Sequence, residues 1–383
     1  MLKIKKQINI LYITSALWNL SITGAWVAIL AARGFSLVEI GLAETVFHIT
    51  SIIFEIPSGV LADVIGRKKM LLISNLLSII ACLIMACTSG FTGVCLSFFF
   101  NAVSWNFSTG SGDALAYDSL KVVKEEERYV KYASNQTIIY RIATAISTLC
   151  AGLALILGYR IAYLLSVVNH LIALFLLFGL KEVEHTEEEH TETDDAKAAS
   201  PAETAVETKH PVRKFFRDST ACFAESFRFL KINRKATVLM FSNALVGACD
   251  ILLLFFLQSK LRDSGLGDTW LGVALFLMEV GGILGAKLVL LVKKWRYALL
   301  FAVCTLIVLL GIALEHTGIT AVMVLGGFLS AAADDALQIR SDAKLQDMFS
   351  SAQRATLISI SSFVFSVEMI VLSPLAGWFF SVW

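Results

Sequence analysis

Residues 59–69 read Gly-Val-Leu-Ala-Asp-Val-Ile-Gly-Arg-Lys-Lys, and they lie where a long apolar stretch ends. Gly59 and Gly66 flank Asp63, and a basic run, Arg67–Lys69, follows. Glycine lets a backbone turn and lets helices approach closely. Basic residues directly after an apolar stretch mark the cytoplasmic end of a membrane span. The segment therefore predicts a tight cytoplasmic loop between two membrane helices.

The composition of the whole chain also indicates a membrane protein. Of its 383 residues, 57% are hydrophobic and only 16% are charged, whereas soluble domains have about 45–50% and about 25%. The 32 basic and 31 acidic residues nearly balance, which argues against nucleic acid as a partner. The seven cysteines show no CxxC or Cys/His cluster, so neither a disulfide framework nor a metal site is expected.

Eleven stretches are long and apolar enough to cross a hydrocarbon core, which takes about 20 residues per helix. They are residues 8–32, 38–62, 70–88, 92–117, 132–156, 160–180, 236–259, 269–292, 297–315, 319–339 and 355–380. Outer-membrane strands would instead be alternating segments of about 10 residues. We therefore expect an all-α polytopic membrane protein.

The loops between these spans fix an expected orientation. Lys and Arg gather before the first span and after the second, fourth, eighth and tenth, while the opposite loops carry few. The positive-inside rule then places the N-terminus in the cytoplasm. We expect a multi-pass protein of the cell's inner or plasma membrane.

One long polar segment, residues 181–235, divides the spans into six and five. We expect a six-helix N-terminal bundle at 1–180, a cytoplasmic linker, and a C-terminal bundle at 236–383. The first part of the linker is acidic and uniformly polar, which predicts disorder. Its second part predicts an amphipathic helix, either at the membrane interface or packed beneath the bundle. The aromatic and apolar face of that helix is Phe216, Phe223, Phe227 and Leu230.

The two halves also echo each other. Gly112-Asp-Ala-Leu in the fourth span parallels Asp334-Asp-Ala-Leu in the tenth. A weak internal repeat at corresponding spans is typical of transporters built from two parallel halves.

The segment 59–69 resembles the signature GxLaDrxGrk of the major facilitator superfamily, which lies between helices 2 and 3. Its position, its direction and the division of the spans agree with that family. The resemblance implies two six-helix bundles, and because eleven spans are visible, the twelfth helix of the family is expected to be absent from this sequence. The strings at 55–59 (EIPSG), 116–120 (AYDSL) and 354–356 (RAT) resemble a little-characterised bacterial branch of permeases and efflux proteins.

The resemblance also implies a cytoplasmic gate. Carried over from the family, Asp63 pairs with Arg354 at the start of helix 11, and Arg67 pairs with Asp118 at the end of helix 4. Such pairs would lock the cytoplasmic side while the carrier faces outward. The alternative is that these charges only solvate a loop and set the topology. The expected gating motif is Gly59, Asp63, Gly66, Arg67, Asp118 and Arg354.

Ionisable residues inside spans cost about 2.5–3.5 kcal/mol each on insertion scales, so each suggests a function. The candidates for proton coupling are Glu55, Asp113, Arg141, Asp250, Glu279, Asp334, Asp335 and Glu368. Glu55 could instead brace the kink at Pro57. Asp334 and Asp335 diverge by about 100° on a helix, so one is expected to face the cavity and the other a neighbouring helix.

Arg141 is the deep cation of the N-terminal half, and an unpaired Arg at that depth is implausible. We expect it to meet Asp113 or Glu55. A carboxylate that gains and loses an Arg during the cycle can release and take up a proton. Glu315, by contrast, lies at a span end and is expected to face water.

Polar and aromatic residues within the first, second and fourth spans are candidates for the substrate cavity. They are Trp18, Asn19, Trp26, Glu44, His48, Asn101, Trp105 and Thr109. In the second span, Glu44, His48, Ser51, Glu55 and Ser58 form one helical stripe. The tryptophans could instead serve packing or anchor the helices at the interface.

These observations predict a secondary active transporter that moves a small molecule by alternating access, with proton-coupled export favoured. Span 5 lacks the GPxxGG motif of many proton antiporters, so uptake of a sugar or metabolite, or a non-transporting sensor with this fold, remain alternatives. No nucleophile–base pair or GxxxxGK[ST] loop occurs, so an enzyme is not expected. No cofactor is expected, and the proton gradient is the expected energy source. The expected partners are the substrate, protons and the lipid bilayer, and the protein is expected to be a monomer.

Overall fold

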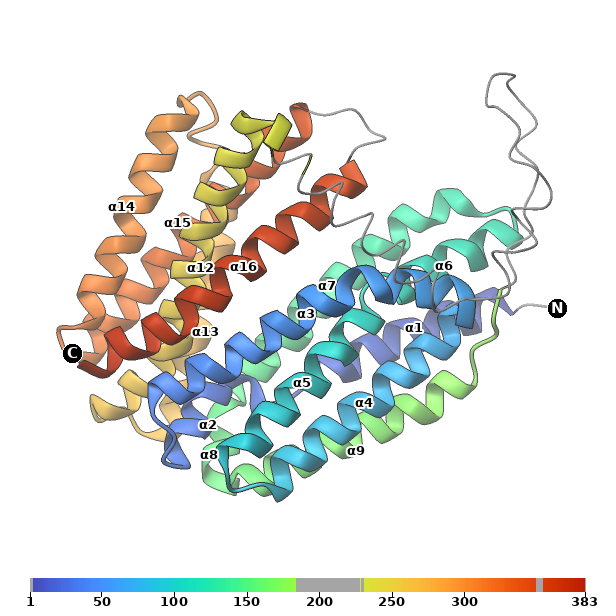
Figure 1. Cartoon of the computed structure of the whole chain (residues 1–383), viewed down its shortest axis with the longest axis horizontal. Coiled ribbons are helices and arrows are strands. Elements are labelled where there is room, and N and C mark those ends of the chain that lie inside the picture. Colours follow the sequence, from blue (N-terminus) through green and yellow to red (C-terminus); the bar gives the residue numbers. More distant parts are fainter. Residues whose placement is uncertain (1–2, 184–227, 229–230, 349–353, 383) are drawn as a thin grey trace.

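The computed structural model describes residues 3–183, 228, 231–348 and 354–382, without the side chains of Ile56, Val60, Asp63 and residues 354–359. All regular structure in these ranges is helical (Figure 1), which confirms an all-α membrane protein. The predicted amphipathic helix, with Phe216 on its apolar face, and most of the acidic linker lie outside the described residues.

The first half of the chain forms eleven helical segments. They are α1 (Ile4–Asn19), η1 (Ile22–Ala25), α2 (Trp26–Ala32), α3 (Leu37–Ile65), α4 (Arg67–Cys87), α5 (Phe91–Ser108), α6 (Ser111–Val122), η2 (Glu126–Arg128), α7 (Tyr129–Leu149), α8 (Ala151–Leu157) and α9 (Tyr159–Phe178). The second half contributes α12 (Arg234–Asp263), α13 (Asp268–Leu288), α14 (Tyr297–Glu315), α15 (Thr320–Asp347) and α16 (Arg354–Val382).

Nine helical stretches of the described chain are long and apolar enough to span a membrane, or ten when the bent pair α7–α8 counts as one span. Ten of the eleven expected spans are thereby accounted for. The remaining stretch, 92–117, is the fourth in chain order. It corresponds to α5 and α6 and is not apolar enough to count as a membrane span. Its polar residues, including Asn101 and Asn106, lower its hydropathy, and the chain breaks at Thr109–Gly110, where Gly110 has a φ of +78°.

Local sequence explains where α3 begins and ends. Ser36 caps its start in a capping box, in which the Ser36 side chain accepts from the Glu39 backbone N–H and the Glu39 carboxylate accepts from the Ser36 backbone N–H. This arrangement satisfies two otherwise unpaired backbone donors. Gly66 ends the helix at a φ of +102°, a conformation that favours glycine. The two helices α3 and α4 therefore meet at a sharp turn beside Arg67.

The two groups of helices, α1–α9 and α12–α16, approach each other most closely at the end where α3 begins, called here the Leu37 end (Figure 1). There α3 packs on α16, and a Cβ at Gly41 would collide with the carbonyl of Ser373. The backbone N–H groups of Val27 and Ala28 donate to Oε1 of Gln258 on α12, at 3.2 and 3.5 Å. Glycine and these hydrogen bonds thus close this end.

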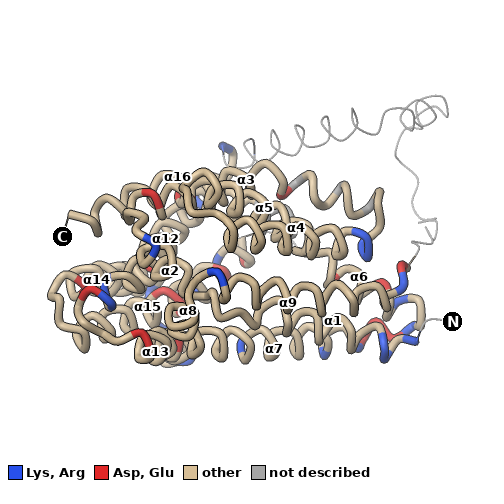
Figure 2. Tube along the Cα trace, turned by 90° about the horizontal axis from the view of Figure 1, so that it is seen from below, with Lys and Arg blue, Asp and Glu red and all other residues tan. Residues whose placement is uncertain are grey.

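A hydrophobic core shared by both groups lies beside these contacts. Ile29 and Ile40 from the first group pack in one cluster with Leu252, Phe256 and Met369 from the second. At the opposite end, called here the Arg67 end, charged residues gather near the N-terminus and α6 (Figure 2). The halves are therefore joined at the Leu37 end by apolar packing, while charge concentrates at the other.

Candidate functional site

A central cavity of about 770 Å³ lies between the two groups of helices. Its walls extend along α3 to Gly59 and along α15 to Leu345, so it is nearer the Arg67 end than the closed Leu37 end. Most of the residues that line it have polar side chains. From the first group come His48, Ser51, Glu55, Ser58, Trp105, Asn106 and Thr109, and from the second Asn243, Gln338, Asp342, Ser361, Ser362 and Ser366.

The predicted stripe on α3 faces this cavity over most of its length. Four of its members line the wall, and Ser51 accepts a hydrogen bond from Nδ2 of Asn106 at 3.1 Å. His48 joins the two halves, because its Nδ1 lies 3.2 Å from Oγ of Ser366 on α16. Its Nε2 lies 3.4 Å from Oε1 of Glu44. The helical periodicity of the sequence thus located one wall of the cavity.

The opposite wall contains three residues that the sequence reasoning missed: Asn243, Gln338 and Asp342. Nδ2 of Asn243 donates to Oε1 of Gln338 at 2.5 Å, and Nε2 of Gln338 donates to Oδ1 of Asp334 at 3.2 Å. Polar residues at i and i+4 along α15 carried a signal for this wall. A chain of amide hydrogen bonds therefore leads from the cavity to a buried carboxylate.

Asp334 belongs to a group of carboxylates from three helices, together with Asp250, Glu279 and Asp335. Asp250, which is 4% exposed, interacts electrostatically with the other three and accepts a hydrogen bond from Oγ of Ser330 at 2.5 Å. This places four of the predicted proton-coupling candidates close together. Glu368 lies apart from them on α16, where it interacts with Cys249.

The adjacent aspartates diverge, as their spacing predicts. Oδ1 of Asp334 approaches Gly247 on α12, and Oδ2 of Asp335 approaches Gly282 on α13. The expectation that one of them faces the cavity is wrong, because neither lines it. Both turn toward neighbouring helices whose glycines leave room for a carboxylate, and Gln338, one turn further along α15, takes the place at the cavity wall.

The structure gives Arg141 other partners than the expected Asp113 or Glu55. Arg141 interacts electrostatically with Glu279 and Asp335 of the second half, and the interactions resolved for Asp113 and Glu55 do not include it. The reason is the orientation of α7, which packs against α13. Arg141 therefore joins the two halves electrostatically instead of pairing within its own.

In the signature region, Arg67 and Asp118 form an ion pair whose side chains are largely buried. The pair connects the first residue of α4 to α6. The other expected pair, Asp63 with Arg354, involves side chains outside the described set. The structure thus contains one half of the expected gate as a contact, and the gating role itself stays a prediction.

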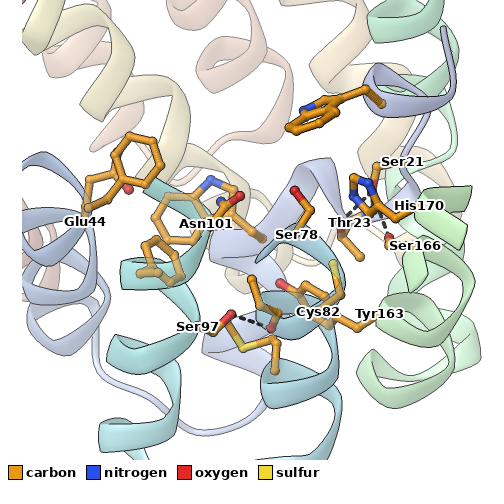
Figure 3. Close-up of a pocket in the computed structure, with 16 residues that line it drawn as sticks. Ser21, Thr23, Glu44, Ser78, Cys82, Ser97, Asn101, Tyr163, Ser166 and His170 are labelled. Carbon is orange, nitrogen blue, oxygen red and sulfur yellow. Dashed lines mark hydrogen bonds between the residues drawn. The ribbon is translucent and has the colours of Figure 1, made fainter. Parts of the chain in front are cut away.

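The remaining cavity candidates line two pockets inside the first group of helices. A pocket of about 330 Å³, called here the inner chamber, is lined by Trp18, Trp26, Glu44 and Asn101 among others (Figure 3). A second pocket of about 400 Å³ surrounds the break between α5 and α6. Among its lining residues are Trp18, Asn19, Trp105, Thr109 and Asp113. Trp18 lines both pockets, so they adjoin.

Glu315 corrects another expectation. It is 4% exposed, and neither of its carboxylate oxygens has a hydrogen-bond partner among the described residues. Its electrostatic partner is Lys260 at the end of α12. His316, directly after α14, packs against the rings of Phe379 and Phe380 on α16. This end of α14 is therefore covered by α16, and Glu315 faces a small pocket instead of open solvent.

Comparisons with known proteins agree with this architecture. The family model described as Major Facilitator Superfamily matches residues 9–333. No curated protein matches the sequence significantly.

Three solved structures share the fold at low sequence identity. The nucleoside transporter NupG is 15% identical with a TM-score of 0.70, covering 98% of this chain and 90% of that one. A bacterial homologue of the human lysosomal transporter Spinster, in an inward-facing and unoccupied conformation, is 14% identical with a TM-score of 0.68, covering 97% and 80%. A D-xylose-proton symporter is 13% identical with a TM-score of 0.60, covering 99% and 89%.

The family match spans most of the chain, and the helices enclose a cavity between two groups. This chain therefore belongs to the Major Facilitator Superfamily and is a secondary transporter.

Proposed function

We propose that this transporter exports a small molecule in exchange for protons, by alternating access through the central cavity. The observation that supports this most is the cavity itself, which both halves line and which lies toward one end while the other end is packed shut. A cavity of this size accommodates a small molecule. Opening the Leu37 end and closing the Arg67 end would carry the molecule across.

Buried carboxylates support proton coupling. Glu55 lines the cavity directly, and Asp334 is connected to it through Gln338 and Asn243. A substrate that changes the hydrogen bonds of Asn243 would also change the environment of Asp334. Because desolvation and nearby charges set whether a carboxylate holds a proton, this chain offers a physical route from substrate to proton.

The direction of transport rests on orientation. The positive-inside rule assigns the Arg67 end to the cytoplasm, in an inner or plasma membrane. The cavity lies toward that end, where an exporter takes up its substrate. The second candidate is proton-coupled uptake, which is favoured by the similarity of the fold to a D-xylose-proton symporter.

The expected organisation fits the same proposal. Residues 1–180 and 236–383 would move as two bundles, joined by the linker at 181–235, and a monomer would suffice because one chain contains the whole cavity.

Transport in everted membrane vesicles tests the proposal. Vesicles with the full chain should accumulate at least one compound of a broad panel when their lumen is acidic, and dissipating the pH gradient should abolish this. Accumulation only in right-side-out vesicles would identify uptake instead. A lack of flux for every compound, with folded protein present, would contradict the proposal.

A further inference from the structure

The inner chamber is a separate compartment from the central cavity. Its walls come from α1, η1, α2, α3, α4, α5 and α9, all in the first half of the chain (Figure 3). It adjoins the central cavity at Phe47, which lines both. Its volume of about 330 Å³ is within the range of small-molecule sites.

The described lining of the chamber contains a negatively charged residue type but no Lys or Arg. Among the described residues that line it, Glu44 is the one acidic side chain. Arg33 lies nearby but is engaged elsewhere, since its Nη2 donates to the carbonyl of Thr88 at 2.7 Å and its guanidinium stacks 4.2 Å from the ring centre of Tyr159. The partner of Glu44 is the imidazole of His48 and not a permanent cation. The chamber therefore repels anions and attracts cations.

Aromatic rings make up much of the remaining wall, and neighbouring rings hold them in place. Trp26 packs edge-on against Phe98 and Phe255, each at 5.1 Å between ring centres. Trp18 packs edge-on against His170 at 5.4 Å. The faces of Trp and Phe rings attract cations, most strongly where water is excluded. A chamber that holds a buried carboxylate and fixed tryptophans is suited to an organic cation.

The serine and threonine hydroxyl groups of the chamber are already paired with protein groups. Ser97 donates to the carbonyl of Ala81 at 2.8 Å, and Ser78 bonds to Ser104 at 2.6 Å. In contrast, Asn101 is exposed, and no hydrogen bond of the described residues involves its side chain. A sugar or another polyhydroxylated neutral molecule needs many free partners, and the chamber offers few.

We infer that the inner chamber binds small organic ammonium ions, with Glu44 as the counter-ion and Trp18 and Trp26 as the aromatic wall. The inference that these ions are cargo rests on the proposed function, whereas the inference that they bind does not. Phe47 is then the boundary that a bound ion crosses to reach the central cavity. Asn101 provides one further contact, for a hydroxyl or carbonyl group on the ion.

Equilibrium binding to the purified full-length chain in detergent tests the inference without any gradient. The probe is radiolabelled choline, and the competitor is 3,3-dimethylbutan-1-ol, its neutral isostere. Choline should bind saturably, and the isostere should compete at least about tenfold less well, because only charge differs between them. Equal competition by the two compounds, or a lack of choline binding to the folded protein, would overturn the inference.

Two variants locate the site. Glu44→Gln should weaken choline binding at least about tenfold. Glu39→Gln is the matched control on the same helix, because glutamine also completes a capping box, and it should bind choline as the wild type does. Asn101→Phe should block the chamber while it keeps Glu44 and breaks no described hydrogen bond.

Wild-type affinity in Glu44→Gln or in folded Asn101→Phe would refute this location. Choline binding without choline transport in vesicles would leave the site intact and count against the cargo role. Transport of other compounds without choline binding would count against the site and leave the proposed transport function standing.

Discussion

Asn243 on α12 donates a hydrogen bond of 2.5 Å from its Nδ2 to Oε1 of Gln338 on α15. Both side chains line the central cavity, and Gln338 in turn donates to Asp334. Because Asp334 and Asp250 interact, the cavity wall is connected to a pair of buried carboxylates. We propose that this connection couples the substrate to protons.

The first prediction concerns Asp334. Asp334→Asn removes a titratable group but keeps an acceptor for Gln338, so proton-driven transport should be lost while substrate exchange without a gradient persists. The two modes are measured in proteoliposomes with and without a pH gradient. Asp347→Asn, an exposed position on the same helix, is the control and should leave both modes unchanged. Wild-type driven transport by Asp334→Asn would show that the proton site lies elsewhere.

The second prediction concerns the ion pair of Arg67 and Asp118. Removing either partner leaves a largely buried charge without its main contact, so Arg67→Ala should destabilise the protein by about 1.5–3 kcal/mol. The apparent melting temperature in detergent measures this loss. The double variant Arg67→Ala/Asp118→Ala should lose less than the sum of the single variants. Simple additivity would mean that the pair contributes no interaction of its own.

The third prediction concerns Arg141, which interacts across the halves with Glu279. Arg141→Ala removes the positive charge that interacts with Glu279 across the two halves, so it should lower the transport rate about fivefold, corresponding to about 1 kcal/mol. Exchanging the charges, with Arg141→Glu and Glu279→Arg together, should recover part of the rate that each single change loses. A double variant no better than the worse single variant would exclude a direct interaction.

The fourth prediction concerns the closed Leu37 end. Gly41→Ala places a methyl group against the carbonyl of Ser373 and should push α3 away from α16, whereas Gly24→Ala meets nothing within 4 Å. Hydrogen–deuterium exchange of the first turns of α3 should therefore rise in the first variant and not in the second. Unchanged exchange in Gly41→Ala would mean that the closed end tolerates a wider separation.

Much of the architecture follows from local sequence. Runs of apolar residues locate the helices, the capping box of Ser36 and Glu39 marks the start of α3, and Gly66 marks its end. The stripe that includes His48 and Glu55 needs only helical periodicity to be assigned to one face. These features depend on residues within a few turns of each other, so they can be predicted from a single sequence.

The errors concern contacts between distant segments. The partner of Arg141 depends on how α7 meets α13 across the two halves, which no local pattern encodes. The burial of Glu315 depends on a distant contact, the packing of the neighbouring His316 against Phe380 on α16. Asn243 and Gln338 could not be predicted in the same way. A neutral amide inside a span has a lower insertion free energy than a charged residue, so its presence there indicates a function less strongly.

We propose above that the central cavity exchanges a small molecule for protons. Everted vesicles acidified by respiration, with a fluorescent dye that reports their internal pH, test it most directly. Adding a transported compound should restore the dye signal in wild-type vesicles, because protons leave as the compound enters, and should fail to do so in Asp334→Asn vesicles. A wild-type signal that no compound in the panel restores, or equal restoration in the variant, would contradict the account.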